Sequence, residues 1–105
     1  QPWLLGVMAL RGQLLPVIDL GFRLQGRPSQ GDKVLVLDSE RPVGFLVDDV
    51  RNIEDVGELK PLPLELPDNV KRFLVGSFFH GGDIVLVLDL KKVLTEQELS
   101  EVTAP

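Results

Sequence analysis

The sequence predicts a mainly β protein built from small barrels, and two observations lead to this prediction. First, the chain contains a repeat without a gap, because residues 3–24 read WLLGVMALRGQLLPVIDLGFRL and residues 73–94 read FLVGSFFHGGDIVLVLDLKKVL. Second, about six short apolar runs are separated by Gly, Pro and Asp turn signals. Closure into barrels is the simplest arrangement of such strands, because it removes exposed sheet edges.

The bulk composition indicates a globular chain and excludes several classes of function. The chain has 105 residues, a hydrophobic content of 44% and a net charge of −5, which fits one domain or two small intertwined ones. The negative charge argues against nucleic acid or an anionic membrane surface as the partner. The absence of cysteine excludes disulfides and thiolate metal sites, and no apolar run is long enough to insert into a membrane.

The repeated unit predicts a strand, a cap and a short helix. Residues 84–88 (IVLVL) are unbroken apolar positions, which predicts a strand covered on both faces. Asp89 follows as an N-cap, and a short helix is expected over residues 90–94. The first copy repeats this order with a strand over residues 14–20 and Asp19 as the cap of a turn that ends at Leu24.

The first thirty residues carry three further signals. Residues 2–5 predict a short helical turn that holds Trp3, and Gly12 with Gln13 predicts a tight hairpin turn. Pro16 cannot donate to a β-ladder, so its strand lies at an edge, contains a bulge or leaves an N–H position unpaired. Residues 25–32 form a polar loop.

The middle of the chain predicts two clear strands and one weak strand. Residues 33–38 and 43–50 are the clear ones, and Gly44 marks a close backbone approach or a bulge. A weaker strand is expected through residues 53–59. Three prolines in residues 60–67 limit that segment to an extended connection or a sheet edge.

The C-terminal third predicts a hairpin flanked by short helices. Asp68 and Asn69 are expected to cap a turn that ends at residue 72. Residues 75–80 and 83–89 form the hairpin around two consecutive glycines. A last helix over residues 95–102 begins with the capping-box pattern of a threonine followed three positions later by a glutamate.

No group of residues predicts catalysis, a cofactor or a metal site. His80 is the only histidine, and a partly exposed residue at a hairpin end is favoured over a general base or ligand. The pair Asp19 and Asp89 is better explained by capping than by acid–base chemistry, because both stand in the same repeat context. The glycines match no phosphate-binding loop, and no serine stands in a nucleophile elbow.

A group of acidic residues favours a solvated edge over a cation site. An EF-hand would require alternating ligands, a glycine at its bend and a closing glutamate, and this order is absent. The four acidic residues are Asp48, Asp49, Glu54 and Asp55.

Arg11 is the one charged residue for which two interpretations remain open. It is the only charged side chain between Gln1 and Asp19, and its counterpart in the second copy is Gly81. It is either an exposed turn residue or an interface arginine. Its planar fork suits a carboxylate, and arginine is enriched at binding hot spots.

At these residues the sequence resembles the CheW-like domain of bacterial chemotaxis. The three blocks WLLGVMALRGQLLPVIDL, VGFLVDDV and FLVGSFFHGGDIVLVLDLKKVL look like that family's signatures and occur in its order. They span nearly the whole chain. One departure is Ala9, which stands where the family usually has asparagine.

The resemblance implies a single domain over residues 1–105 with two intertwined, five-stranded SH3-like barrels. Residues 1–32 and 73–105 are expected in the first barrel and residues 33–72 in the second. The family normally carries roughly forty residues ahead of the Trp3 position, including the first strands of the first barrel. We therefore expect an N-terminally truncated first barrel whose open edge invites a homodimer or strand exchange.

The resemblance also implies a non-catalytic adaptor in the cytoplasm, associated with receptor arrays at the inner membrane. Such domains couple the cytoplasmic tips of chemoreceptors to the regulatory domain of a CheA-type histidine kinase. The protein-binding residues expected from the matching positions are Arg11, Gly44, Val47, Asp48 and Val50. The alternatives are a ligand-binding or enzymatic small β-barrel, or a module of a larger signalling protein used for self-association.

Overall fold

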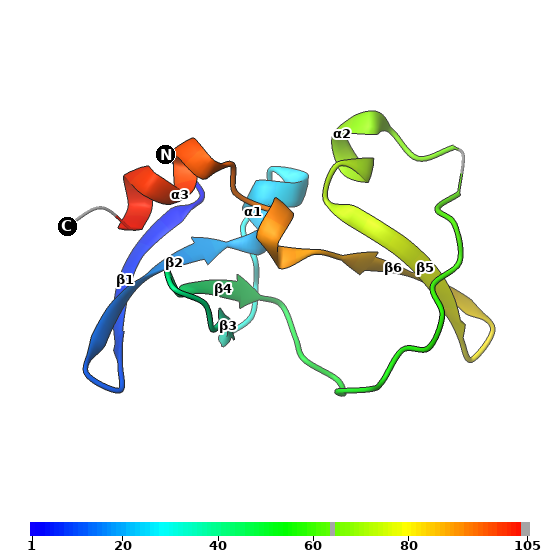
Figure 1. The fold of residues 1–105 in the computed structure, drawn as a ribbon, viewed down its shortest axis with the longest axis horizontal. Helices are drawn as coiled ribbons and strands as arrows, with labels where there is room; N and C mark the ends of the chain where they lie inside the picture. The colour runs from blue at the N-terminus through cyan, green and yellow to red at the C-terminus, as the bar shows by residue number, and fades with distance from the viewer. Residues whose placement is uncertain (64, 104–105) are drawn as a thin grey trace. The chain divides into compact units, whose positions relative to one another are not determined.

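A computed structural model describes residues 1–63 and 65–103 and confirms a mainly β chain of two sheets and short helices (Figure 1). The chain divides into two compact units: Gln1–Arg51 with Glu96–Pro105, and Asn52–Thr95. Residues 33–51 thus share a unit with residues 1–32, whereas residues 73–95 belong to the other unit. The assignment of segments to a first and a second five-stranded barrel stays a prediction.

The first unit contains a four-stranded sheet in the order β1-β2-β4-β3. Strand β2 runs antiparallel to β1 and parallel to β4, and β3 and β4 are antiparallel neighbours. Side chains from β2 and β4 fill the centre of this unit, where Leu15, Ile18 and Phe45 are fully buried. The strands are β1 (Leu4–Leu10), β2 (Gln13–Asp19), β3 (Lys33–Leu37) and β4 (Val43–Val47).

The turn between β1 and β2 lies one residue earlier than expected. Its central residues are Arg11 and Gly12, with φ angles of 52° and 80°, and not Gly12 and Gln13. Positive φ at both central positions is the requirement of a type I′ hairpin turn, whose twist matches the flanking strands. The position of the glycine alone did not show that the residue before it shares this conformation.

Pro16 does not place its strand at a sheet edge, so the edge interpretation was wrong. Strand β2 lies between β1 and β4. Pro16 is opposite Val7 on the β1 side, and the parallel pairing with β4 begins only at Val17, directly after the proline. The register shift of this pair lies between Leu4 and Gly6 of β1, so there is no bulge at Pro16 itself. The third interpretation, a position without a ladder partner, holds on the β4 side.

Two helices complete the first unit. Helix α1 (Leu20–Gln25) begins at Asp19, whose carboxylate accepts the Phe22 N–H at 3.1 Å, so the predicted cap is confirmed. Helix α3 (Glu96–Thr103) agrees with the prediction for residues 95–102.

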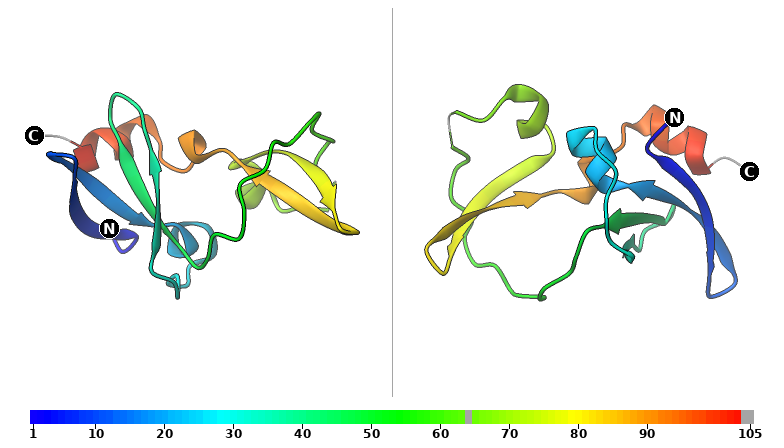
Figure 2. Two further views of the ribbon diagram at one scale, coloured as in Figure 1. Left: turned by 90° about the horizontal axis from the view of Figure 1, so that it is seen from below. Right: turned by 180° about the vertical axis from the view of Figure 1, so that it is seen from behind.

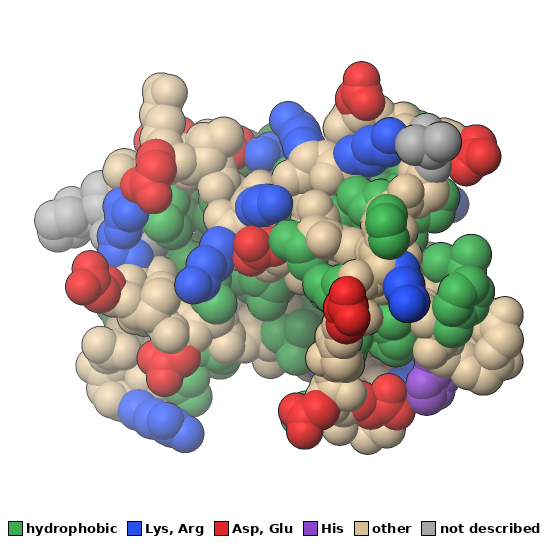
Figure 3. Space-filling view, turned by 45° about the vertical axis from the view of Figure 1, so that its right-hand side comes forward, with side chains coloured by type: hydrophobic (Ala, Val, Ile, Leu, Met, Phe, Trp, Pro, Cys, Tyr) green, Lys and Arg blue, Asp and Glu red, His purple; other side chains and the backbone are tan. Residues whose placement is uncertain are grey.

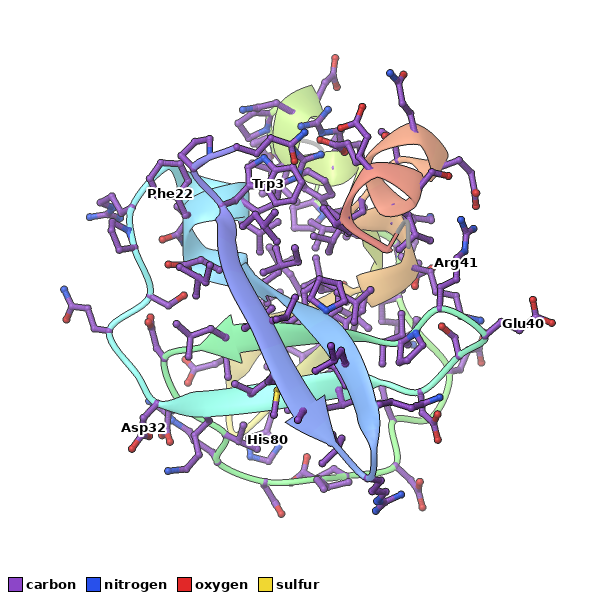
Figure 4. All side chains as sticks on the ribbon, turned by 90° about the vertical axis from the view of Figure 1, so that its left-hand side faces the viewer. Trp3, Phe22, Asp32, Glu40, Arg41 and His80 are labelled. Carbon is purple, nitrogen blue, oxygen red and sulfur yellow. The ribbon has the colours of Figure 1, made fainter. Side chains whose placement is uncertain are left out.

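Ion pairs hold α3 against the rest of its unit. The Arg23 guanidinium lies 2.8 Å from the Glu98 carboxylate and 5.3 Å from the centre of the Trp3 ring. Arg41, on the loop from β3 to β4, turns toward α3 (Figure 4) and pairs with Glu96 at 2.9 Å. The Arg23–Glu98 pair is partly buried, whereas the Arg41–Glu96 pair is exposed. Such pairs orient the helix more than they stabilise it.

The second unit is built around one hairpin, β5 and β6, which Figure 2 shows from two sides. Its turn at Gly81 and Gly82 is confirmed, and so is Asp89 as a cap, since its carboxylate accepts the Lys91 N–H at 3.0 Å. The short helix before the hairpin has Pro67 as its N-cap, with no side-chain cap bond, so the predicted capping by Asp68 and Asn69 was wrong. The elements are α2 (Asp68–Lys71), β5 (Leu74–His80), β6 (Asp83–Leu88) and the 3₁₀-helix η1 (Leu90–Lys92).

The weak strand expected over residues 53–59 is absent from the structure. The side chain of Ile53 is 92% exposed, and the nearest pairing is a single bridge between Lys60 and Ser77. Within the described residues the segment meets β5 only at this bridge, so the apolar residues before it have no ladder partner. In the proline-rich segment over residues 60–67, Leu64 lies outside the described residues.

Strand β6 was expected to be covered on both faces, and this was wrong. Its only partner in the described part of the chain is β5, and Ile84 remains 56% exposed. Phe79 on β5 is 69% exposed, and hydrophobic side chains lie beside the histidine on the surface in Figure 3. An unbroken apolar run predicts burial only when a further layer is present to bury it.

Candidate protein-interaction site

The five residues expected at the site all belong to the first unit, at two ends of β4. Arg11 lies at the hairpin end, in the wall of a cleft that also includes Pro42, just before β4 begins. Asp48 and Val50 lie beyond the last residue of β4. The structure therefore separates Arg11 from the signature residues that follow β4.

Gly44 is a core position of the sheet and offers no surface of its own. It is buried, and a Cβ added there would lie 2.8 Å from the Val34 side chain and 3.3 Å from that of Leu15. The backbone of Gly44 is therefore approached closely, by neighbouring side chains and not by another backbone segment. The absence of a side chain at Gly44 leaves room for the side chains of the neighbouring strands. Val47, the last residue of β4, is half-buried.

The strand ends at Val47, three residues before the predicted end, because the chain turns outward at Asp48. The Asp48 carboxylate accepts the Gln30 N–H at 2.7 Å, which ties the exit of β4 to the loop over residues 26–32. The backbone of Gly31 passes so close to this exit that any Cβ there would collide with the carbonyls of Val47 and Asp48. Asp48 therefore has a structural role, because its carboxylate holds the loop over residues 26–32 in place.

A buried network around Asp19 holds the same loop, and sequence reasoning found only its capping part. The Asp19 carboxylate accepts the Ser29 hydroxyl at 2.6 Å and the Ser29 N–H at 3.0 Å. The Ser29 hydroxyl oxygen also accepts the Gly21 N–H at 2.9 Å. Ser29 stands in a polar loop without regular structure, so no periodic signal could have identified it as a partner of Asp19.

These hydrogen bonds change the acidity of Asp19. Burial raises the pKa of this carboxyl, but the hydrogen bonds from Ser29, Phe22 and Gly21 favour the charged form and bring the pKa below its ordinary value. Asp19 is therefore a fixed negative charge at neutral pH. Its role is structural, because the groups that donate hydrogen bonds to its carboxylate lie in its own unit.

The hairpin end carries a second feature, a cleft of about 320 Å³ that is lined by apolar, polar and charged residues. The sequence offered no signal for it, because its walls come from β1, β2, β3 and the loop before β4. The lining residues are Leu10, Arg11, Gln13, Leu15, Val36, Asp38 and Pro42.

Two other kinds of site are absent from the part of the chain that the structure describes. Within residues 1–63 and 65–103, no cluster of three or more His, Asp or Glu side chains could hold a metal ion. Over the same residues, no helix has the length and apolar character needed to cross a membrane. The described surface is thus best characterised by its cleft and by the exposed residues after β4.

Comparison with known proteins decides the family. The family model of the CheW-like domain matches residues 1–98. This chain belongs to the CheW-like domain family. The resemblance of its three sequence blocks is thereby confirmed.

Two curated relatives show how far the CheW-like match extends. The probable chemotaxis protein CheW of Rhizobium etli is 31% identical over 102 residues, which cover 91% of this chain and 66% of the relative. The chemotaxis protein CheW of Rhizobium meliloti is 30% identical over the same length, with the same coverage. The chain thus spans just under two thirds of the length of these relatives.

A solved structure supports the fold of the CheW-like chain. The crystal structure of the scaffolding protein TtCheW from Thermoanaerobacter tengcongensis matches with a TM-score of 0.69 at 23% identity. The match covers 86% of this chain and 65% of that protein. At this identity the likeness concerns the fold alone.

Proposed function

We propose that this CheW-like chain is a non-catalytic adaptor of bacterial chemosensory signalling that acts in the cytoplasm. In this role it couples the cytoplasmic tips of chemoreceptors to the regulatory domain of a CheA-type histidine kinase. The observation that carries the proposal is the family match over residues 1–98, together with relatives that are named chemotaxis proteins. No observation on the described residues favours the alternative of an enzymatic or ligand-binding barrel.

The surface after β4 supports a docking role. Val50 is an apolar side chain that remains 37% exposed, and it follows a loop junction that the Asp48 carboxylate holds in place. Protein interfaces gain most of their affinity from a few side chains that are buried against the partner, and an exposed apolar side chain on a fixed backbone can be buried in this way. We assign partner contact to Val50 and Val47, a positioning role to Asp48, and a packing role to Gly44.

Binding experiments with the two proposed partners test this function. We expect the protein to retain both a CheA-type regulatory domain and a receptor-tip fragment in a pull-down, and to join them in one complex. Binding of neither partner by the protein in its full natural length would contradict the adaptor proposal. Binding of only one would restrict the proposal to that partner.

A charge placed at Val50 tests the docking surface itself. We expect Val50→Glu to weaken binding of one partner about tenfold, because a buried carboxylate in an interface has no counter-charge. Val56→Glu is a matched control, since Val56 is 40% exposed in the other unit. If the two variants bind alike, Val50 lies outside the interface.

The unpaired edge of β6 supports a second proposal, self-association. Strand β6 has a row of apolar residues, and β5 is its only strand partner among the described residues. Such an edge can pair with a second copy of the chain. Light scattering over a range of concentrations should then detect dimers, and a monomer at all concentrations would contradict this proposal.

A further inference from the structure

One residue of the polar loop over residues 26–32 lies where two parallel strands end. Strands β2 and β4 pair in parallel, and the last pair of their register is Asp19 with Leu46. The Ser29 hydroxyl donates to the Asp19 carboxylate at 2.6 Å, and its oxygen lies 3.3 Å from the Leu46 carbonyl oxygen. The Ser29 N–H also donates to the Asp19 carboxylate, at 3.0 Å. Ser29 thus contacts both strands close to the point where β4 leaves the sheet.

Two glycines let this loop lie directly against its neighbours on both sides. A Cβ added at Gly21 on α1 would lie 2.6 Å from the Ser29 hydroxyl oxygen, and a Cβ added at Gly31 would collide with the carbonyls of Val47 and Asp48. Neither glycine has a positive φ, so the space and not the backbone conformation requires glycine at these positions. The loop is therefore packed between α1 and the exit of β4.

The residue after Ser29 continues the connection to the docking surface. The Gln30 N–H donates to the Asp48 carboxylate at 2.7 Å, and Asp48 stands two positions before Val50. Asp48 is exposed, so this bond competes with water, whereas the Asp19 carboxylate that holds Ser29 is buried. Hydrogen bonds to a charged group are stronger where water is excluded. The loop is thus anchored at Ser29, and the exposed bond to Asp48 depends on that anchor.

We propose that Ser29 is a positioning residue of the docking surface after β4, because it fixes the backbone from which Val50 meets the partner. Ser29 itself does not contact the partner in this arrangement, since its hydroxyl is engaged by Asp19 and Gly21. The inference rests on the proposed function, in which Val50 is an apolar contact. An interface segment that is ordered in advance loses less entropy on binding, so removal of the anchor should weaken binding without removing a contact.

Titrations with the CheA-type regulatory domain and the receptor-tip fragment as probes test this role. We expect Ser29→Ala to weaken binding of one probe about fivefold, and this should be the probe that Val50→Glu affects. Ser29→Thr keeps the hydroxyl and should restore most of the affinity. Ser39→Ala is the matched control, because it removes a hydroxyl of the same unit that donates to the Arg41 carbonyl within its own loop. This control should bind as the wild type does.

A double variant distinguishes positioning from a direct contact or a general loss of stability. If Ser29 acts through the segment that carries Val50, the Ser29→Ala/Val50→Ala variant should bind within about twofold of Val50→Ala alone. Ser29→Ala combined with Val56→Ala, a change in the other unit, should keep the whole effect of the serine replacement. All titrations use conditions in which circular dichroism shows the variants folded. If Ser29→Ala does not fold, Gly31→Ala replaces it, because the added Cβ displaces the loop from the exit of β4.

The outcomes separate this inference from the adaptor function. If the wild type binds a probe and both Ser29→Ala and Gly31→Ala bind it equally well, the positioning role is wrong and the adaptor function stands. If Ser29→Ala weakens binding as much in the Val50→Ala background as in the wild type, Ser29 acts independently of Val50, which also contradicts the inference. If the wild type binds neither probe, the adaptor function and this inference fail together.

Discussion

The two copies of the repeat adopt the same hairpin but differ in what covers it. Leu4 pairs with Ile18 in the first copy and Leu74 with Leu88 in the second, each followed by an irregularity before the next glycine. In both copies the aspartate at the end of the second strand donates its N–H to the carbonyl of the leading aromatic residue, at 2.7 Å and 2.9 Å. The two copies thus share the same register, turn geometry and cap.

Burial separates the copies, and it depends on residues outside the repeat. Strand β2 gains β4 as a parallel neighbour, and Leu15 and Ile18 have exposed fractions of 1% and 0%. Strand β6 has no such neighbour in the described part of the chain, and the equivalent residues Val85 and Leu88 are half-buried. The same apolar pattern therefore contributes differently to stability in each unit.

Truncation of equivalent core residues should show the largest difference. We expect Ile18→Ala to cost about 4 kcal/mol, because a fully buried side chain leaves a cavity among close-packed neighbours. Leu88→Ala should cost about 1.5 kcal/mol, since part of that side chain already contacts water. Native-state hydrogen exchange of the β2 and β6 amides measures both values within their own units. Equal losses would show that the two hairpins are covered alike.

This comparison also shows which parts of the fold the sequence could predict. Signals within a few residues were sufficient for the Asp19 and Asp89 caps and for the turn at Gly81 and Gly82. Signals that depend on distant partners failed: the weak strand around Ile53 has no neighbour, and the strand with Pro16 lies inside its sheet. Pairing between strands remote in sequence is not encoded in the periodicity of either one.

Removal of the two caps should have the next largest effect. Asp19→Ala removes an acceptor of the Phe22 and Ser29 groups inside the unit, and we expect a loss of about 3 kcal/mol. Asp89→Ala removes the bond from the Lys91 N–H and should cost about 1 kcal/mol, as for an ordinary cap. Urea denaturation, with hydrogen exchange to separate the units, measures both. If Asp89→Ala lowered the free energy of unfolding as much as Asp19→Ala, the larger number of hydrogen bonds at Asp19 would not account for its contribution.

The same network predicts a pH dependence that belongs to the first unit. Because the pKa of Asp19 is lowered in the folded state, the unfolded chain binds more protons there as the pH falls below about 4. The contribution of Asp19 is complete above its ordinary pKa and is lost as the pH approaches the lower folded pKa. Fluorescence of Trp3, the only tryptophan, should show the stability difference between wild type and Asp19→Asn shrinking below pH ~4. A constant difference down to pH ~3 would contradict the lowered pKa.

The candidate site was predictable in part, for reasons that the two copies make clear. Arg11 was identified because it stands where the second copy has Gly81, a contrast within one sequence. The partners it meets at the cleft, Val36, Asp38 and Pro42, come from the β3–β4 segment and could not be predicted from the repeat. Ser29 was missed for the same reason, since its bond to Asp19 closes a loop of irregular backbone.

Exchange of the turn residues between the copies should produce the smallest effect. Gly81→Arg places a Cβ at a φ of 60°, and we expect a loss of about 1 kcal/mol from the second unit. Arg11→Gly removes the cost of the same conformation in the first unit, but the greater freedom of glycine in the unfolded chain offsets part of this stabilisation. We therefore expect the free energy of unfolding to rise by about 0.5 kcal/mol. Arg51→Gly, in an exposed segment without a turn, is the matched control and should not stabilise its unit. If Gly81→Arg costs nothing while Arg11→Gly stabilises, the backbones of the two turns are not equivalent.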